Sequence, residues 1–182
     1  MARVPYLEQA DLAPQNRDLL TRNINLYRAL VNSPDAARSF LGLGSYIRFH
    51  SKLDPRLREM AILQVGYVTR SPYEYSHHVK IGRDFGVTNE DIRAIELDTQ
   101  GQPTSLSALE RAVLRAAREL TAQPNLSDAT AAELKKGLDN ERFVDLLLTI
   151  SFYCGVVRLL AALQIDVEED YMPYLQEFPL PG

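Results

Sequence analysis

Apolar and polar residues along the chain recur mostly at helical spacing, and residues that start or stop helices separate these segments. From about residue 15 to 32, apolar side chains repeat every three or four positions, which predicts one helix after an extended arm of about residues 1–14. Pro34 is expected to open a second helix, which Gly42 and Gly44 interrupt because glycine lowers helical propensity. Alternating β-branched runs bounded by hairpin turns are missing, so the sequence predicts an all-α fold.

Capping residues and prolines mark the remaining helices. The expected segments cover about residues 55–69, 72–86, 89–97, 107–122, 127–138 and 140–165. The segment that starts at Pro55 is apolar on nearly every face, which predicts a central helix with Glu59 largely buried. The unusually apolar segment at 140–165 is expected to form a core or subunit-interface helix. The tail at about 176–182 is expected to be an extended arm, either disordered or packed on a neighbouring subunit.

Composition favours one folded domain over residues 1–182, because 46% of the 182 residues are apolar. The net charge is -4 without a basic stripe, so nucleic acid is not an expected partner. The N-terminus lacks an apolar signal core, and the longest apolar runs, near 146–150 and 159–163, are shorter than a membrane span. We therefore expect a cytoplasmic protein with no membrane partner. The single cysteine, Cys154, excludes an internal disulfide and a Cys-x-x-Cys pair, and it is expected to be a small buried side chain.

Titratable residues converge at one place, at the start of the helix predicted from Pro72. On that helix His78 has Glu74 four positions back and Tyr75 three back, so His78 is expected on the inward face. Gly82, one turn further on, leaves room for a ligand or for a close helix crossing. A carboxylate beside an inward histidine can orient the ring and move its pKa toward the working pH, which is the arrangement of a general acid or base.

Structural roles also account for the same residues. Ser71-x-x-Glu74 is a capping box, and His78 can be a core histidine with its hydrogen bonds satisfied. A buried Glu59 needs a partner. The candidate partners are Arg56, Arg58, Arg111 and Arg115.

A metal site is a further alternative, because Glu74 and His78 stand four residues apart on one helix. The candidates for a third ligand are His77, His50 and Glu59. The chain has only three histidines, so this ligand set is thin and the sequence predicts no metal.

Residues 58–65 and 73–79, followed by Gly82 and Gly86, resemble the carboxymuconolactone decarboxylase family, which is related to alkyl hydroperoxidase D. The resemblance implies an all-α fold that assembles into a homo-oligomer, a trimer or hexamer, with a small-molecule site near a subunit boundary.

In the peroxidase branch of this family, a Cys-x-x-Cys pair precedes a histidine by four residues, and a glutamate lies in the preceding helix. These four positions correspond to Ser71, Glu74, His78 and Glu59. Without the two thiols, peroxide reduction by that mechanism is excluded.

The decarboxylase branch is similar in having a Glu-aromatic-x-x-His pattern without cysteines, with Tyr75 here where tryptophan is common. This resemblance implies a cofactor-independent lyase that acts on a small carboxylated or lactone substrate. It assigns acid-base catalysis to His78, orientation of the ring to Glu74, and a second proton-carrying role to Glu59. The expected substrate contacts are Tyr75, His77, Ser71 and Arg58, with Arg70 as a further cation for a departing carboxylate. Two alternatives remain, a cysteine-independent peroxidase or other oxidoreductase of the same superfamily, and a non-catalytic oligomeric binding protein.

Overall fold

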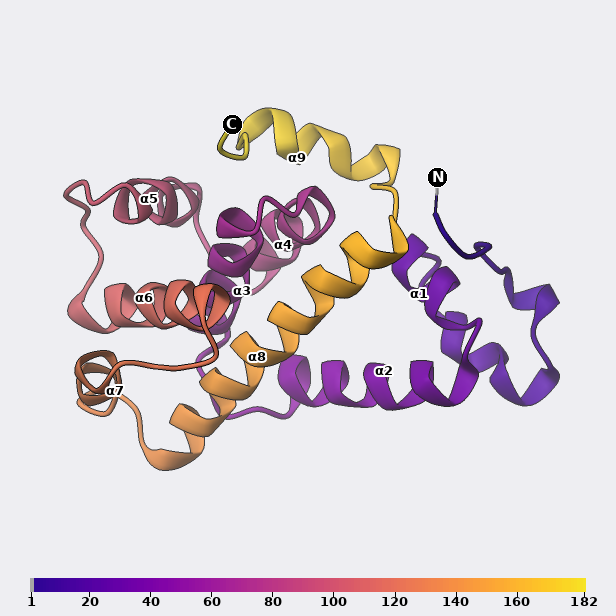
Figure 1. The fold of residues 1–182 in the computed structure, drawn as a ribbon, viewed down its shortest axis with the longest axis horizontal. Helices are drawn as coiled ribbons and strands as arrows, with labels where there is room; N and C mark the ends of the chain where they lie inside the picture. The colour runs from indigo at the N-terminus through magenta and orange to yellow at the C-terminus, as the bar shows by residue number, and fades with distance from the viewer. Residues whose placement is uncertain (1) are drawn as a thin grey trace.

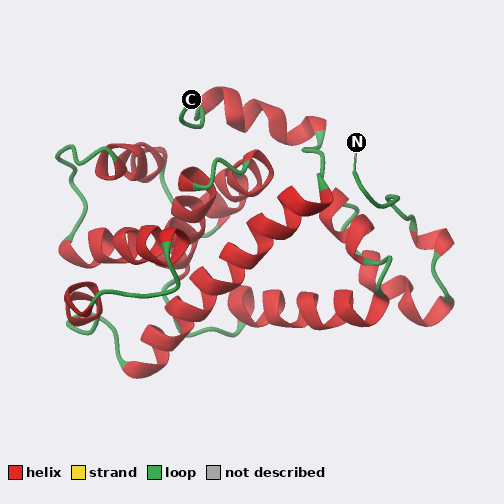
Figure 2. Cartoon of the chain, viewed as in Figure 1, coloured by secondary structure: helices red, strands yellow, loops and turns green. Residues whose placement is uncertain are grey.

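The computed structural model describes residues 2–182, and over that range the chain forms helices and loops without a strand (Figures 1 and 2). The elements are η1 (Gln9–Asp11), η2 (Pro14–Leu20), α1 (Asn25–Leu30), α2 (Pro34–Phe49), α3 (Pro55–Val68), α4 (Pro72–Asp84), α5 (Asn89–Thr99), α6 (Ala108–Ala122), α7 (Asp128–Leu134), α8 (Asn140–Leu163), η3 (Glu169–Tyr171) and α9 (Met172–Glu177), where η denotes a 3-10 helix. The predicted all-α class is confirmed. Assembly into a trimer or hexamer and a cytoplasmic location stay predictions.

Helix α3 lies at the centre of the molecule and packs against α4, α5, α6 and α8. Every residue from Leu57 to Tyr67 is buried, as the all-round apolar pattern predicts. Asp54 starts the helix by accepting a hydrogen bond from the backbone N–H of Leu57 at 3.0 Å. Because Glu59 belongs to this helix, its side chain is held in the core with 1% exposure. Such a carboxylate must find partners.

The single helix predicted for residues 15–32 is wrong, because the chain forms η2 and α1 with a bend between them. Leu19 and Leu20 pack into an N-terminal cluster with η1 and α2. Leu26 packs in another direction, beside Tyr73 and the C-terminal half of α8. One straight helix cannot present these side chains to both clusters, so tertiary packing overrides the helical pattern.

Helix α2 is continuous, although Gly42 and Gly44 were expected to interrupt it. A Cβ atom at either glycine would meet no heavy atom within 4 Å, so neither glycine is required by close packing. Gly82 on α4 differs, because a Cβ atom there would lie 3.3 Å from Val87 and 3.6 Å from the Cβ of Glu59. Of its two predicted roles, Gly82 therefore serves the close approach of α4 to its neighbours and leaves no ligand space.

The terminal segments pack on the same chain. In the N-terminal arm, the backbone N–H of Arg3 donates to the carbonyl of Leu163 at 2.8 Å. At the other end, α9 extends into the predicted C-terminal arm, and Phe178 is 5% exposed in the main core. Arg83 and Arg93 each lie 5.6 Å from the Phe178 ring. The expectation that this arm is disordered is therefore wrong, whereas its packing on a neighbouring subunit stays a prediction.

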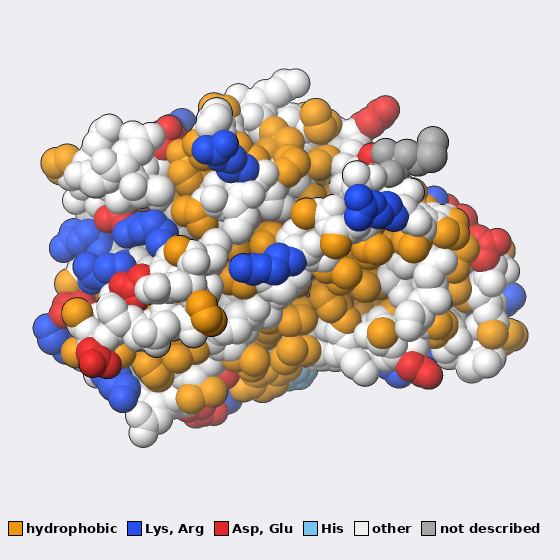
Figure 3. Space-filling view, in the orientation of Figure 1, with side chains coloured by type: hydrophobic (Ala, Val, Ile, Leu, Met, Phe, Trp, Pro, Cys, Tyr) orange, Lys and Arg blue, Asp and Glu red, His pale blue; other side chains and the backbone are white. Residues whose placement is uncertain are grey.

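Helix α8 crosses the molecule diagonally and packs on α3 and α6 (Figure 1). Its most apolar window has a mean hydropathy of 2.0, so by length and composition α8 could cross a membrane. The expectation of no membrane partner stays a prediction. Core helices of globular proteins share these properties, and 39% of the window is buried here. Val144 on this helix is 60% exposed, and Figure 3 shows hydrophobic side chains across the middle of the face that α8 crosses.

Candidate functional site

His78 lies between two carboxylates that come from two helices. Its Nδ1 is 2.7 Å from Oε2 of Glu59 on α3, and its Nε2 is 3.0 Å from Oε1 of Glu74 on α4. Glu59, Glu74 and His78 are 1%, 3% and 5% exposed, so water screens these charges weakly. The i, i+4 spacing on α4 and the close packing of α3 on α4 bring the three residues together, as the sequence predicts.

The two carboxylates set the protonation state of His78. Burial lowers the pKa of the imidazole because it disfavours the charged ring, but the negative charges of Glu74 and Glu59 outweigh burial and raise the pKa to about 9. The ring is therefore an imidazolium at neutral pH, with Nδ1–H donating to Glu59. The ring of Tyr153 packs edge-on against it, with centroids 5.1 Å apart.

Glu59 is held from behind by Arg58. Nε of Arg58 donates to Oε1 of Glu59 at 3.0 Å, and Nη1 donates to the carbonyl of Arg48 at 3.0 Å. Burial raises the pKa of Glu59, but the adjacent His78 and Arg58 charges outweigh it, so the pKa is lowered and the group stays ionised. Arg58 is 2% exposed and does not line the cavity described below. Arg58 therefore positions Glu59, and the predicted contact between Arg58 and substrate is not supported.

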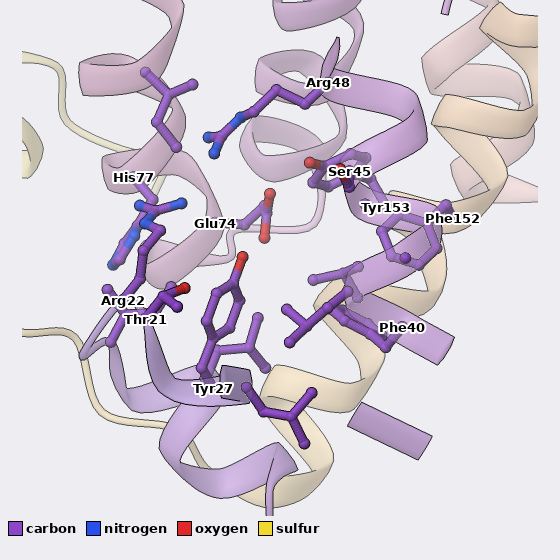
Figure 4. Close-up of a pocket in the computed structure, with 18 of the residues that line it drawn as sticks. Thr21, Arg22, Tyr27, Phe40, Ser45, Arg48, Glu74, His77, Phe152 and Tyr153 are labelled. Atoms are coloured by element: carbon purple, nitrogen blue, oxygen red, sulfur yellow. The ribbon is translucent and has the colours of Figure 1, made fainter. Parts of the chain in front are cut away.

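Glu74 points into a cavity and does not cap its helix. Ser71 makes no side-chain capping hydrogen bond at the start of α4, so the capping box expected for Ser71 and Glu74 does not form. Oε1 of Glu74 is buried and has no well-aligned hydrogen-bond partner among residues 2–182, despite lying close to Nε2 of His78. Figure 4 shows the carboxylate in the middle of the cavity, between Arg48 and Tyr27. An under-satisfied carboxylate in this position is free to accept a proton or a hydrogen bond from a ligand.

The cavity has a volume of about 450 Å³ and lies between α2, α4, α8 and the turn before α1. Phe40, Phe152 and Tyr153 form an aromatic wall on one side, whereas His77 and Arg22 lie opposite (Figure 4). Both Gly42 and Gly44 line it, and their missing side chains leave room. Glu59 is not among the lining residues and reaches the cavity only through His78.

Arg22 and Arg48 bring two positive charges to the lining of the cavity, where Glu74 and Asp18 are the carboxylates. Neither forms an ion pair within the described part of the chain, and each lies over aromatic rings, Arg22 over Tyr27 and Arg48 over Phe49 and Phe85. An adjoining hollow shares both arginines and adds Lys80 and Asp84. Cations beside a largely aromatic cavity favour a small anionic ligand.

His77 also lines the cavity, but its surroundings differ from those of His78. Its ring is stacked between Tyr73, 4.1 Å away, and Tyr171, 3.5 Å away, and its Nε2 lies 2.8 Å from Oε2 of Glu168. Burial lowers the pKa of His77 by more than Glu168 raises it. His77 is thus a neutral ring at pH 7 that joins α4 to the C-terminal segment.

Two predicted contact residues lie away from the cavity. Tyr75 is 2% exposed and packs in the main core against Gly66 and Tyr67, so it forms no wall of the site. Ser71 lines a separate hollow on the other side of Tyr73.

The sequence missed Arg22, Arg48 and Tyr27 as site residues. No local motif marks them, because they reach the cavity only when the bend before α1 and the end of α2 fold over α4. Among residues 2–182, no group of three or more His, Cys, Asp or Glu side chains is arranged to hold a metal ion. The single cysteine, Cys154, lies away from the cavity, against Thr121 and Leu120.

Solved structures share the fold over nearly the whole chain. A peroxidase-related protein from Ralstonia eutropha JMP134, described as an alkylhydroperoxidase AhpD core, has a TM-score of 0.80 and 18% identity, covering 99% of this chain and 98% of that one. A variant of the debrominase Bmp8 in complex with 2,3,4-tribromopyrrole has a TM-score of 0.83 and 22% identity, covering 98% of both chains. A peroxidase-related protein from Silicibacter sp. TM1040 has a TM-score of 0.72 and 19% identity, covering 91% of both. At these identities the likeness concerns the fold.

No curated protein matches the chain by sequence. A family model does match, over residues 34–119, from the start of α2 into α6. That region carries Glu59, Glu74 and His78, together with Arg48 from the cavity. The model is that of the carboxymuconolactone decarboxylase family, so residues 34–119 are similar to that family.

Proposed function

We propose that the protein is a cofactor-independent, decarboxylase-like lyase that acts on a small carboxylated or lactone substrate by acid-base catalysis. The observation that carries the proposal is the placement of the His78 imidazolium, 2.7 Å from Glu59 and 3.0 Å from Glu74, beside the carboxylate that enters the cavity. A buried acid with a pKa of about 9 holds a proton at neutral pH and can release it to a stronger base formed during a reaction. A carbanion or dienolate is such a base.

The reaction balances with this chain's own groups. The bond between the carboxylate carbon and the substrate ring breaks, carbon dioxide leaves, and the bonding electron pair remains on the ring as a dienolate. His78 supplies the proton that ends on the substrate carbon, either directly or through Glu74, and solvent restores it afterwards. Glu59 stabilises the imidazolium and fixes the ring, while Arg58 keeps Glu59 ionised. The roles of the two glutamates are thereby exchanged relative to the sequence-based expectation.

Arg22 and Arg48 would serve a different part of the reaction. A cation that only held the departing carboxylate would stabilise the ground state, because that negative charge leaves the carboxylate in the transition state. A cation beside the oxygen where the dienolate charge develops lowers the barrier instead. Both arginines line the cavity, so one can bind an acid group while the other stabilises the developing charge.

The test is release of carbon dioxide from a panel of lactone acids by the wild type, Glu59→Gln and His78→Ala. A lyase of the proposed kind turns over at least one of them, and both variants lose most of that rate. Equal rates in the three proteins would remove these residues from the mechanism. Tyr75→Phe is the matched control, because Tyr75 is on the same helix but packs in the core.

Two rival functions give different results. A non-catalytic binding protein would bind the acids without turnover, and His78→Ala would keep that affinity. A cysteine-independent oxidoreductase would carry a redox cofactor after purification, visible in its absorption spectrum, and would consume a peroxide without releasing carbon dioxide. Neither rival requires the imidazolium to exchange its proton with a ligand.

A further inference from the structure

A second hollow of about 540 Å³ lies on the other side of Tyr73 from the catalytic cavity. It is bounded by the turn between α3 and α4, the end of α6 and the C-terminal half of α8. The apolar residues that line it are Pro72, Tyr73, Val157, Leu160, Ala161 and Ile165. Val157 and Leu160 are 5% and 3% exposed and form its floor. Tyr73 lines both hollows and separates them.

Two arginines stand at this hollow without an acidic partner. Arg70 and Arg158 both line it and are exposed, and neither forms an ion pair with a described residue. Arg158 donates from Nη1 to the carbonyl of Cys154 at 2.6 Å, which leaves its other N–H groups available. The lining of the hollow contains no Asp or Glu. In Figure 3, acidic side chains lie toward the margins of this face, whereas hydrophobic and basic ones occupy its middle over α8.

The backbone is strained on both sides of the hollow. Among residues 2–182, Arg70 and Gln164 are the two non-glycine residues with positive φ, at 51° and 54°, and both line it. The left-handed conformation costs a non-glycine residue about 1–2 kcal/mol. At both residues this conformation ends a helix: the backbone N–H groups of Arg70 and Ser71 donate to the carbonyls of Tyr67 and Gly66, and those of Gln164 and Ile165 donate to the carbonyls of Ala161 and Leu160. The turn after α3 places the guanidinium of Arg70, which has no ion-pair partner among the described residues, beside an apolar floor.

We propose that this hollow is a second ligand site, which binds an amphiphilic carboxylate. The head group lies between Arg70 and Arg158, and an aliphatic body covers Val157 and Leu160. A ligand charged along its whole length would leave the apolar floor uncovered, whereas an uncharged apolar one would leave both arginines unpaired. At the start of α4, the N–H groups of the first turn have no side-chain cap, and they add to the attraction for a carboxylate. The site is independent of the proposed lyase activity.

Binding of octanoate, measured by isothermal titration calorimetry on the full chain, tests the proposal. Arg70→Asn and Arg158→Gln each remove one charge, and asparagine tolerates the left-handed backbone at position 70. We expect each to weaken octanoate binding at least tenfold. Ala161→Phe keeps both charges but fills the hollow, and it should abolish binding. Octanol and octylamine, which lack the carboxylate, should bind much more weakly than octanoate.

Arg48→Gln is the control, because Arg48 lines the catalytic cavity and its adjoining hollow but not this one. The proposal requires that this variant bind octanoate like the wild type. Weaker binding in Arg48→Gln, with Arg70→Asn and Arg158→Gln unchanged, would place octanoate in the catalytic cavity and overturn the second site. Absence of binding to the wild type at millimolar octanoate would overturn it as well. Self-association of the protein through this face in the absence of octanoate would also overturn the second site. Ala161→Phe would disrupt such self-association in sedimentation experiments. Circular dichroism establishes that each variant is folded.

Discussion

His77 and His78 are consecutive residues on one helix, yet the protein gives them opposite acid-base properties. Both are buried, at 4% and 5% exposure, and both contact a glutamate. His77 has one carboxylate, Glu168, and lies between two tyrosine rings, so burial prevails and its pKa is lowered. His78 has two carboxylates, and its pKa rises to about 9. The number of fixed anions around a buried ring, more than burial itself, decides whether it carries a proton.

The largest expected effect is on turnover. His78→Gln removes the proton donor, and general acid-base catalysis typically contributes 10²–10⁴-fold, so we expect a rate loss of about that size on any lactone acid that the wild type decarboxylates. His77→Gln should retain a rate within about tenfold, because a neutral ring that is stacked and bonded to Glu168 does not donate the proton. Initial rates of carbon dioxide release check both. Similar losses in the two variants would abolish the functional distinction between the histidines.

The pH dependence of stability should also separate them. The folded pKa of His78 is raised from 6.5 to about 9, so its protonated ring stabilises the fold fully below about pH 6.5, and this contribution disappears as pH rises through 9. At about 1.4 kcal/mol per pKa unit, the loss is on the order of 3 kcal/mol. Urea unfolding at pH 6 and pH 10 measures it.

Comparison of wild type with His78→Gln removes the contributions of other groups that titrate in the same range. The wild type should lose more stability between the two pH values than the variant does. His77→Gln should lose nearly as much stability as the wild type, because the pKa of His77 is lowered from 6.5 and its effect on stability is confined to the acidic end of this range. Parallel curves for wild type and His78→Gln would mean that folding does not raise the pKa of His78.

Glu59→Gln tests the two-carboxylate explanation directly. The variant keeps the size of the side chain but removes one of the two negative charges, so the pKa of His78 should fall from about 9 toward 6.5. It also leaves Arg58 buried without its carboxylate, which should lower stability. Histidine ring signals followed by NMR against pH report the pKa of each ring. An unchanged His78 pKa would show that Glu59 contributes no charge to the site.

Much of the fold and the centre of the site were accessible from sequence. The caps at Asp54, Thr88 and Ser107 and the periodicity between them fix α3, α5 and α6 locally. The i, i+4 relation of Glu74 and His78 is equally local, and the apolar pattern of α3 already required a partner for Glu59. These features need no knowledge of distant contacts.

The features of the site that could not be predicted from the sequence depend on tertiary contacts. Ser71 and Glu74 match a capping box, yet the attraction of the buried His78 imidazolium and the cavity turns Glu74 away from the helix end. Arg48 reaches the cavity because α2 folds over α4, with its carbonyl held by Arg58. Tyr75, although adjacent to Glu74, faces the core because one residue changes direction by about 100° around a helix of 3.6 residues per turn.

The smallest expected effect concerns the partner of His77. Glu168 accepts hydrogen bonds from the backbone N–H of Asn25 at 2.6 Å and from the Tyr73 hydroxyl at 3.1 Å, and it lies 2.8 Å from Nε2 of His77. Glu168→Gln keeps an acceptor oxygen but loses the charge, so unfolding free energy should fall by about 1–2 kcal/mol. The pKa of His77 should fall further, since Glu168 raises it. Glu169→Gln, at an exposed neighbour, should change stability by less than about 0.5 kcal/mol. If Glu168→Gln proved as stable as Glu169→Gln, aromatic stacking alone would account for the position of His77, and its glutamate would have no part in the contrast with His78.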